Sequence, residues 1–468
     1  MRPYKRRLSN APLIRRCLFL TAVSMACTVL FAMDVPIEPY VMPAQRIKTD
    51  FVQERLDEAP LMSSALQQKK YHDFYQHMYA SDEQGLSPWS EAFVRRQIVS
   101  EYVLPNHVLM QWSNDPPHYG ENYHRHGQRW FKKIHDQMNL EAFHPQQYQA
   151  ERRAITVTNT LARLLPVHEP DFFASTRPGQ GFPFDTLQAS ALFAGTPVYV
   201  AHTTQDKSWS LVLTPDNYMA WIPSHDLAYV SDSFIQTWQT MVKRGLGAVV
   251  KTRASIFNAQ EQYVFSGYLG AVFPLVKQGP QKTQIGIPVK DSHHQARRAV
   301  GFMATDAMET MPQPLTKKNM LRMMDQLHHR PYGWGGAFFF NDCSQEMKSL
   351  FTPFGLWLPR SSALQAQSAH RRDFSSQSDV ERLNALKELG HPFMTLIYVG
   401  GHIMLYLGLH HEEAITYQNV WGLPSLKDDK RYVIGQSVFL PLRLHDPRNP
   451  NVRSLMNKEV FWLIDLDR

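Results

Sequence analysis

The sequence of 468 residues contains only three cysteines, Cys17, Cys27 and Cys343. Cys17 and Cys27 lie in an N-terminal apolar stretch that we interpret as a targeting segment. Cys343 is then an unpaired thiol in the mature protein. In a compartment that oxidises thiols, a spare cysteine is a liability unless it has a role. Cys343 is therefore the first candidate for a nucleophile.

Acidic residues are absent from positions 1–32, which carry six Lys and Arg residues. The apolar run 17–33 follows this basic region and is marginal in length for a membrane span. The pattern predicts a signal peptide over residues 1–33 and an exported protein, either periplasmic or secreted. Retention as a membrane anchor is the alternative. The stretch 24–27 is a poor lipoprotein box because Ser24 stands where an aliphatic residue is needed.

An excess of positive charge is missing from the rest of the chain. The whole sequence has a formal net charge of +7, from 49 Lys and Arg against 42 Asp and Glu. Without residues 1–32, 43 basic residues face 42 acidic ones, a net charge of +1. Nucleic-acid binding would require a basic stripe in the folded part, so we expect no nucleic-acid partner.

Several signatures of other enzyme classes are also missing. The sequence has no glycine-rich phosphate loop and no pair of carboxylates placed as in a glycosidase. Three pairs of adjacent histidines occur, but adjacent residues rarely bind one ion and no cysteine lies at ligand spacing. We therefore expect neither a metal nor another cofactor.

The composition that is present, 43% hydrophobic and 12% aromatic residues, is typical of well-packed globular domains. A chain of this length exceeds one core and predicts three or four domains. Residues 34–154 form the first region: proline-rich positions 34–50 indicate an extended tether, and helical spacing follows. The expected helices are 61–78, 89–102 and 129–139.

Short alternating runs separated by turn residues begin near residue 154. Examples are 196–202, 209–213 and 218–222, which are typical of a small barrel or sandwich. A second, shorter series runs from 248 to 287. We predict two consecutive small β-domains over residues 155–243 and 244–312.

Residues 313–468 mix helices and strands and predict an α+β domain. Helices come first and an antiparallel meander follows. The expected helices are 316–328, 343–351 and 379–389, and the expected strands are 394–399, 402–407, 414–420 and 437–440.

Cys343 would lie at the N-terminus of the helix 343–351, capped by Asn341 or Asp342. The helix dipole and free N–H groups favour an anion there, which would stabilise a thiolate. The same N–H groups could hold an oxyanion. The alternative is that Cys343 is simply a buried apolar side chain.

His402 is the candidate base, because it follows Gly400-Gly401 and opens an alternating strand. A third polar residue has to fix its tautomer. The next strand supplies Gln418 and Asn419, which point to opposite faces, so only one of them can serve. A structural role for His402 is the alternative.

An ordered series of motifs surrounds these residues. It comprises Tyr332-Gly-Trp-Gly-Gly336, Asp342-Cys-Ser344, Phe354-Gly-Leu-Trp-Leu-Pro-Arg360, Gly401-His-Ile-Met-Leu-Tyr-Leu-Gly408 and Asn419-Val-Trp-Gly422. The series resembles the NlpC-type cysteine peptidases, papain-like bacterial cell-wall hydrolases. It is most similar to the branch with a helical N-terminal region and two bacterial SH3 domains. The implied fold is multidomain α+β, with two small SH3-like β-barrels before a C-terminal papain-like peptidase domain.

The resemblance implies cleavage of peptidoglycan stem peptides between D-glutamate, through its γ-carboxyl, and a diamino acid, with a requirement for a free N-terminal L-alanine. Cys343 takes the place of the nucleophile and His402 that of the base. Gln418 falls where the family more usually has histidine, so it can orient the imidazole but cannot supply a charge.

The resemblance also places Tyr332, Asp342 and Ser344 in the substrate site, with Asp342 suited to the alanine ammonium. A core role for Tyr332 and a capping role for Asp342 are the alternatives. The role of Arg360 stays open between holding a loop and contacting substrate.

The sequence therefore predicts an exported cysteine endopeptidase whose partner is peptidoglycan or murein peptides, with membrane contact only through the N-terminal signal or, as an alternative, a lipid anchor. Two alternatives stay open. One is a weakly active or inactive cell-wall-binding protein that uses its SH3-like domains. The other is an acyltransferase that uses the same Cys–His dyad.

Overall fold

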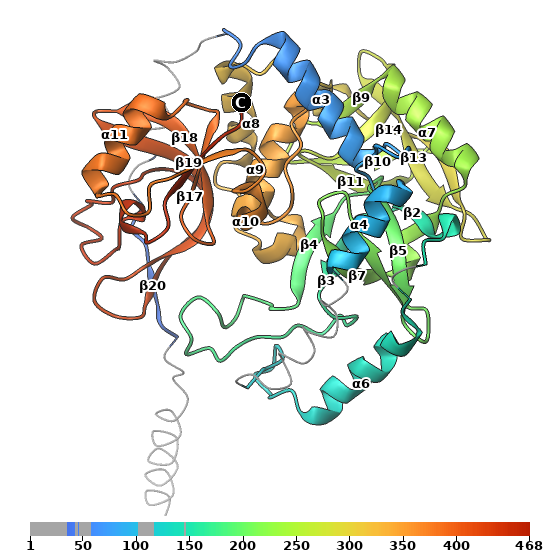
Figure 1. Ribbon diagram of the computed structural model, residues 1–468, viewed down its shortest axis with the longest axis horizontal. Coiled ribbons are helices and arrows are strands. Elements are labelled where there is room, and N and C mark those ends of the chain that lie inside the picture. The colour runs from blue at the N-terminus through green and yellow to red at the C-terminus, as the bar shows by residue number, and fades with distance from the viewer. Residues whose placement is uncertain (1–34, 43–44, 46–57, 102–116, 145–146) are drawn as a thin grey trace, which may run out of the picture.

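The computed structural model describes residues 35–42, 45, 58–101, 117–144 and 147–468. The predicted signal peptide, residues 1–33, lies outside them. The described residues form N-terminal helices and three seven-stranded sheets, which confirms the predicted multidomain α+β class (Figure 1). Among these residues, no helix combines the length and the apolar composition that a membrane crossing requires.

The predicted N-terminal helices are present as α3 (Ser64–Met78), α4 (Glu91–Glu101) and α6 (Gln128–Met138). The side chain of Ser63 caps α3 by accepting a hydrogen bond from the N–H of Leu66. Helix α6 buries residues at helical spacing, Phe131, Ile134 and Met138. The short 3₁₀ turns Leu140–Ala142 and Ala150–Arg152 lead into the first sheet.

The first sheet has the strand order β4-β3-β7-β6-β5-β2-β8. All its pairings are antiparallel, and residues 164–187 form a long connection between β3 and β4. The strands are β2 (Arg153–Thr156), β3 (Thr160–Arg163), β4 (Gln188–Leu192), β5 (Pro197–Thr203), β6 (Trp209–Leu213), β7 (Met219–Pro223) and β8 (Leu227–Tyr229).

The second sheet has the order β11-β10-β14-β13-β12-β9-β15. Its pairings are also antiparallel. The strands are β9 (Leu246–Val249), β10 (Arg253–Phe257), β11 (Tyr263–Tyr268), β12 (Val272–Gln278), β13 (Lys282–Lys290), β14 (Ala296–Ala304) and β15 (Met308–Thr310).

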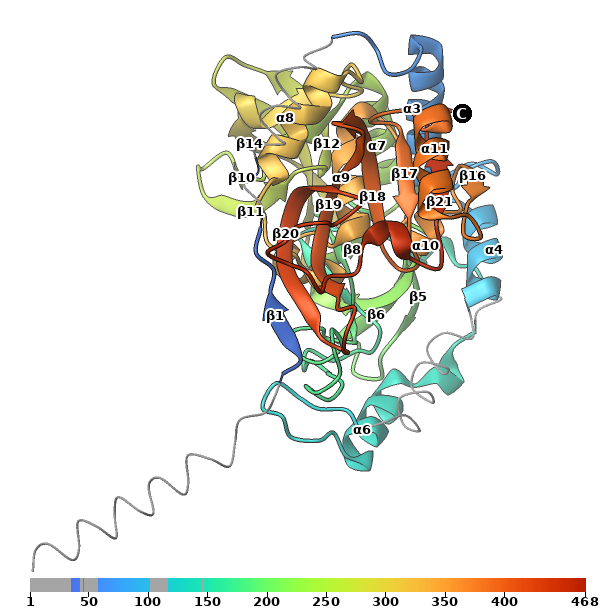
Figure 2. The same cartoon turned by 90° about the vertical axis from the view of Figure 1, so that its left-hand side faces the viewer.

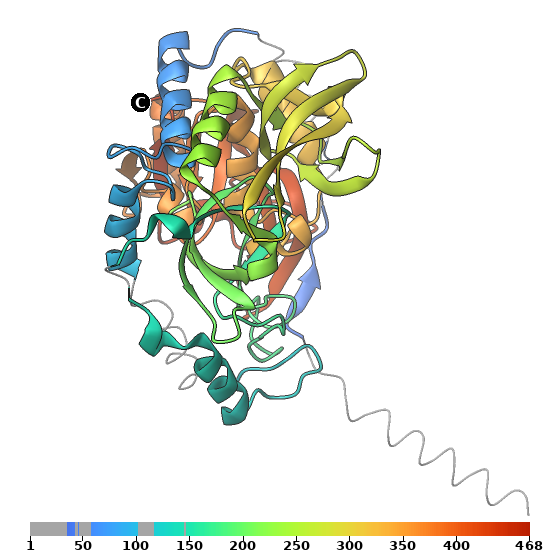
Figure 3. The same ribbon diagram turned by 90° about the vertical axis from the view of Figure 1, so that its right-hand side faces the viewer.

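Helix α7 (Asp232–Arg244) joins the two sheets, where the sequence analysis expected only β-structure. Ser231 caps the helix through a hydrogen bond from the N–H of Phe234, and Phe234 and Trp238 are buried one turn apart. This face packs against α3, whose chain runs beside α7 in Figure 3, and Gln239 Nε2 donates to the carbonyl of Tyr79 at 2.7 Å. The helix therefore ties the N-terminal region to the β-domains.

The third sheet has the order β1-β20-β19-β18-β17-β21-β16. The predicted antiparallel meander is confirmed as β17 to β20, and β16 and β21 extend it. The elements are β16 (His370–Asp373), β17 (Thr395–Tyr398), β18 (Ile403–His410), β19 (Glu413–Pro424), β20 (Arg431–Pro441), β21 (Trp462–Asp465), α8 (Lys317–Leu327), α9 (Cys343–Phe351), α10 (Ser362–Gln365) and α11 (Asp379–Leu389).

Of the proline-rich segment 34–50, the described residues 35–42 are not a free tether, and most of the remainder lies outside the described residues. Residues Ile37–Pro39 form β1, a parallel edge strand on β20 (Figure 2). Proline is tolerated there because an edge strand needs only one row of ladder hydrogen bonds. Tyr40 is buried in the core, and Asn449 brackets Val41 by accepting from its N–H at 3.0 Å and donating to its carbonyl at 2.9 Å.

We predict that Asn449→Ala lowers the free energy of unfolding by about 1–3 kcal/mol, because both backbone groups of Val41 lose their partner. The variant also exposes the segment 35–42 to proteolysis. Asn457→Ala, which removes one exposed hydrogen bond to Asp379, is the matched control. Urea unfolding and limited proteolysis measure both effects. Equal stability and equal cleavage rates for the two variants would contradict the role of Asn449 in holding Val41 in place.

Candidate active site

Helix α9 begins at Cys343, as the sequence predicts. Of the two expected caps, Asp342 is the one used: its Oδ1 accepts from the N–H of Gln345 at 2.9 Å. Met347 and Leu350 anchor the helix in the main core together with the cysteine. Cys343 is therefore held at the N-terminus of a helix that packs on β18 and β19.

His402 lies at the end of the β17–β18 turn, immediately before β18. The turn contains Gly400 and Gly401 with φ values of +66° and +83°, a region that favours glycine. The N–H of Val399 donates to the carbonyl of His402 at 2.9 Å and closes the turn. The two glycines thus place the imidazole at the start of a buried strand.

Gln418 orients His402, and it is Gln418 rather than Asn419 that faces the ring. Gln418 Nε2 donates to Thr416 Oγ1 at 2.9 Å, which leaves Oε1 to accept from His402 Nε2 at 2.7 Å. The hydrogen on Nε2 leaves the lone pair on Nδ1, the nitrogen that can accept the thiol proton. Asn419 instead donates to the carbonyl of Asn341 at 2.9 Å.

Burial dominates the electrostatics of the dyad. It raises the pKa of the Cys343 thiol to about 12, reinforced by the charge of Asp342 and opposed by the N–H of Ile403, Arg360 and the N–H of Ser344. The N–H of Ser344 at the helix N-terminus favours the thiolate as expected, but burial outweighs it in the free site. Burial also lowers the pKa of His402 to about 4, against the opposing hydrogen bond with Gln418. The resting dyad is a neutral thiol and a neutral imidazole.

Asp342 and Arg360 form a buried ion pair beside Cys343. Both Arg360 Nη atoms donate to the carboxylate, with Nη1 at 3.0 Å from Oδ1. Burial alone would raise the pKa of Asp342, but the guanidinium charge and the hydrogen bonds outweigh it and hold the pKa below its ordinary value. Ser344 Oγ donates to Oδ1 at 3.0 Å and accepts from Arg360.

This pairing changes the role expected for Asp342. Its charge is already matched by Arg360, and Oδ1 accepts from Arg360, Gln345 and Ser344. An incoming ammonium group would have to share Oδ2 with the guanidinium. The capping role left open by the sequence is observed, so Asp342 both caps α9 and pairs with Arg360.

Tyr332 is half-buried in the loop that precedes α9, where its N–H donates to the carbonyl of Gly435 at 2.8 Å. Burial raises the pKa of its phenol well above the ordinary value, and the charges of Cys343 and Asp342 add to the effect. The side chain is thus a neutral hydroxyl that lies close enough to Cys343 and Asp342 for their charges to affect its pKa.

The first β-domain forms one wall of this region. Arg360 Nε donates to Ser190 Oγ at 3.1 Å, and Gln188 Nε2 donates to the carbonyl of Gly335 at 2.9 Å. Gly335 and Gly336 have φ values of +57° and +79°, and a Cβ on Gly335 would lie 2.4 Å from the carbonyl oxygen of Gln188. The two glycines therefore let the loop 332–341 lie directly against β4.

An aromatic contact joins the same surfaces. Phe184, from the long connection in the first β-domain, packs edge-on between Trp334 and Trp421, with ring centroids 5.1 and 4.5 Å apart. Trp334 Nε1 also donates to the carbonyl of Asp185 at 3.0 Å. The loop before α9 and strand β19 are thus both fixed to the first β-domain.

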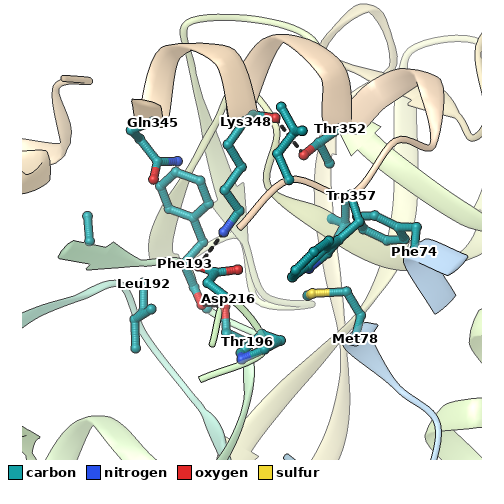
Figure 4. A pocket seen from close by; sticks show the side chains of 16 residues that line it. Phe74, Met78, Leu192, Phe193, Thr196, Asp216, Gln345, Lys348, Thr352 and Trp357 are labelled. Atoms are coloured by element: carbon teal, nitrogen blue, oxygen red, sulfur yellow. Dashed lines mark hydrogen bonds and ion pairs between the residues drawn. The ribbon is translucent and has the colours of Figure 1, made fainter. Parts of the chain in front are cut away.

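A small, mainly apolar cavity of about 40 Å³ with a few polar groups lies where α9 meets α3 and the first β-domain (Figure 4). Lys348 Nζ lies 2.5 Å from Asp216 Oδ2, across the domain boundary. Asp216 Oδ1 and Gln345 Oε1 are buried without a hydrogen-bond partner among the described residues. The space suits one or two water molecules and is too small for a peptide.

Sequence reasoning missed two residues of this region and left a third open. Ser190 comes from another domain and carries no local signal. Glu346 did carry a local sequence signal, because it interrupts the apolar face formed by Cys343, Met347 and Leu350. In the structure it is fully buried. Arg360, whose role was left open, proves to be the buried partner of Asp342. Among the described residues, no cluster of three or more His, Cys, Asp or Glu side chains is arranged to hold a metal.

Two family models match the β-domains. Residues 170–223 match an SH3 domain of SH3b1 type, and residues 231–280 match an SH3 domain of SH3b2 type. A search of curated proteins found no significant match.

Solved structures match over longer spans. The first is described as a novel NlpC/P60 endopeptidase from Photobacterium damselae subsp. piscicida; it is 26% identical, with 92% of this chain and 99% of that chain covered and a TM-score of 0.76. An NlpC/P60 family protein from Bacillus cereus ATCC 10987 is 14% identical, with 68% and 100% covered and a TM-score of 0.43.

The resemblance predicted from the sequence motifs is confirmed by these matches. The domain order is N-terminal helices, two SH3 domains and the domain that contains Cys343. The chain is a multidomain α+β protein with two bacterial SH3 domains, and over most of its length it is similar in structure to an NlpC/P60 endopeptidase, a combination that supports a cell-wall cysteine peptidase.

Proposed function

We propose that the protein is an exported cysteine endopeptidase that hydrolyses peptidoglycan stem peptides at the bond between the γ-carboxyl of D-glutamate and a diamino acid. The observation that supports it most is the Gln418–His402 hydrogen bond, together with a cysteine at a helix N-terminus whose sulfur interacts with the N–H of Ile403, the residue after His402. The match to an NlpC/P60 endopeptidase structure supports the reaction class. Export rests on the basic and apolar residues 1–33, which also provide the only membrane contact that we propose.

In the proposed mechanism, His402 Nδ1 takes the thiol proton as Cys343 Sγ attacks the carbonyl carbon of the scissile bond. N–H groups at the start of α9 can stabilise the oxyanion of the tetrahedral intermediate. His402 then donates the proton to the leaving amine as the C–N bond breaks. Water, activated by the same imidazole, hydrolyses the thioester and restores the thiol.

Because the Cys343–His402 dyad is neutral at rest, Gln418 has to orient the imidazole and does not have to balance a charge. Because burial disfavours an isolated thiolate and an isolated imidazolium, proton transfer has to be coupled to the attack on substrate. Gln418 Oε1 keeps its hydrogen bond to Nε2 through both protonation states of the ring. It supplies orientation without a compensating charge.

The amino end of the substrate would meet Asp342, Ser344 and Tyr332. Arg360 and Ser190 close this region from the side of the first SH3 domain, so the space beyond the first residue is limited. This arrangement supports a preference for short murein peptides with a free L-alanine terminus. The ammonium would be held by Asp342 Oδ2 and neighbouring hydroxyls rather than by an unpaired carboxylate.

We predict that the wild-type protein releases L-Ala-γ-D-Glu from L-Ala-γ-D-Glu-diaminopimelate peptides and that Cys343→Ala abolishes the release. Mass spectrometry of the products identifies the bond, and N-acetylated peptides test the need for a free amine. Ligation products would indicate acyl transfer. Equal product yields from wild type and Cys343→Ala would refute the peptidase, and binding to insoluble peptidoglycan without cleavage would favour a wall-binding protein.

We predict that the acidic limb of kcat/KM lies well below pH 6.5, close to pH 4. His402 has to be neutral to accept the proton, and its lowered pKa keeps it neutral until the pH falls to about 4. The charge of Lys458 contributes to that lowering, so Lys458→Gln moves the limb to higher pH. A limb at or above pH 6.5 in the wild type, unmoved in the variant, would contradict the assignment of His402.

We predict that Gln418→Ala lowers kcat about 10- to 100-fold, because the imidazole loses the acceptor that fixes its tautomer and orientation. Gln418→Glu keeps an acceptor and adds a negative charge, which raises the pKa of His402 and moves the acidic limb upward. Steady-state kinetics across pH distinguish the two variants. Wild-type kcat in Gln418→Ala would show that another group orients the ring.

A further inference from the structure

Glu346 is a buried carboxyl group that the proposed mechanism does not use. It lies on α9, three residues after Cys343, and its side chain is fully enclosed. Burying a carboxyl group is costly unless its oxygens are hydrogen-bonded. Its presence beside the nucleophile therefore calls for a role that an apolar side chain of similar size would not fill.

The carboxyl group of Glu346 accepts hydrogen bonds from three separate segments. Tyr417 Oη and Ser437 Oγ donate to Oε1 at 2.5 and 2.7 Å, and Asn341 Nδ2 donates to Oε2 at 2.7 Å. These partners come from β19, β20 and the loop before α9. All three groups are able to donate, so both oxygens of the carboxyl group have hydrogen-bond partners.

Opposing effects act on the charge of Glu346. Burial raises its pKa, whereas the three donors and the guanidinium of Arg330 lower it, and the net shift is upward. Arg330 is held by the carbonyls of Thr252 and Phe339. It supplies positive charge to the cluster without an ion pair to Glu346.

Strand β19 links this cluster to the orientation of His402. Tyr417 and Asn419 stand on either side of Gln418, on the opposite face of the strand. Tyr417 contacts Glu346, and Asn419 Nδ2 donates to the carbonyl of Asn341 at 2.9 Å. Tyr417 and Asn419, the two neighbours of Gln418, are therefore both hydrogen-bonded to the segment that carries Cys343.

We propose that Glu346 is a positioning residue that sets α9 against β19 and thereby aligns the Cys343 thiol with the His402–Gln418 pair. The inference rests on the proposed function of this dyad. Glu346 touches neither substrate nor the reacting atoms, and acts through Tyr417, Ser437 and Asn341. A displacement of about 1 Å between nucleophile and base is enough to lower a rate about 100-fold.

The test compares wild type, Glu346→Gln and Tyr417→Phe in the full chain. The glutamine amide would direct an N–H group at one of the donors, and the phenylalanine removes one hydrogen bond. We expect kcat to fall at least 10-fold in Glu346→Gln and about 3-fold in Tyr417→Phe, with KM nearly unchanged. We expect alkylation of Cys343 by iodoacetamide, followed by site-resolved mass spectrometry, to slow in parallel.

Two control variants separate positioning from stability. Asp465→Asn alters an equally buried carboxylate in the same domain, which accepts from Arg372 at 2.6 Å and Thr395 at 3.2 Å. Tyr199→Phe removes a buried hydroxyl that accepts from the N–H of Gln149 at 3.0 Å. We expect both controls to lose thermal stability while kcat and the alkylation rate stay at wild-type values.

The outcomes are distinct. Loss of stability in Glu346→Gln and Tyr417→Phe with kcat and alkylation rates unchanged would overturn the inference. If Glu346→Gln does not fold, Tyr417→Phe decides the question by itself. If the wild-type protein cleaves no murein peptide, the proposed function fails, but the alkylation rates of Cys343 still report whether Glu346 positions the thiol.

Discussion

Asp342 and Arg360 carry opposite charges that have lost nearly all contact with water, and several parts of the site are attached to this pair. Asp342 caps the helix that begins at Cys343, and Arg360 reaches Ser190 in the first SH3 domain. The N–H of Arg360 also meets the carbonyl of Asp216 at 3.4 Å. Removing one partner of a buried pair leaves the other charge unpaired, which typically costs about 3–5 kcal/mol. The helix cap, the buried ion pair and the contact with the first SH3 domain are thus one linked arrangement.

The dyad lies in the same dry environment. Desolvation shifts the pKa of the thiol upward and that of the imidazole downward, so each effect reinforces the neutral form of the pair. A neutral thiol is a weak nucleophile at rest and is also less prone to oxidation. For a protein with a single cysteine outside its N-terminal apolar stretch, this would limit unwanted reactions in the oxidising compartment that the proposed export implies.

Local patterns predicted the elements that carry the site. The span of α9 follows from the Asp342 cap and the apolar spacing of Met347 and Leu350, and the order of motifs pointed to His402 and Gln418. The partner of Arg360 could not be read in the same way, because Ser190 lies 170 residues earlier in the chain. The upward shift in the pKa of Cys343 also depends on burial by distant segments. Helix α7 was missed because residues 232–244 lie between two series of predicted strands and were left without a predicted element.

The strand β1 has a consequence for the order of folding. Hydrogen bonds in and beside this strand join Val41 to Asn449, which are 408 positions apart, and Glu38 to Lys430, which are 392 positions apart. Contacts between such distant positions form late, because the intervening chain has to be ordered first. β1 therefore has no partner strand until the residues of β20 are available. During synthesis from the N-terminus, the segment that closes the last sheet is made first and docks last.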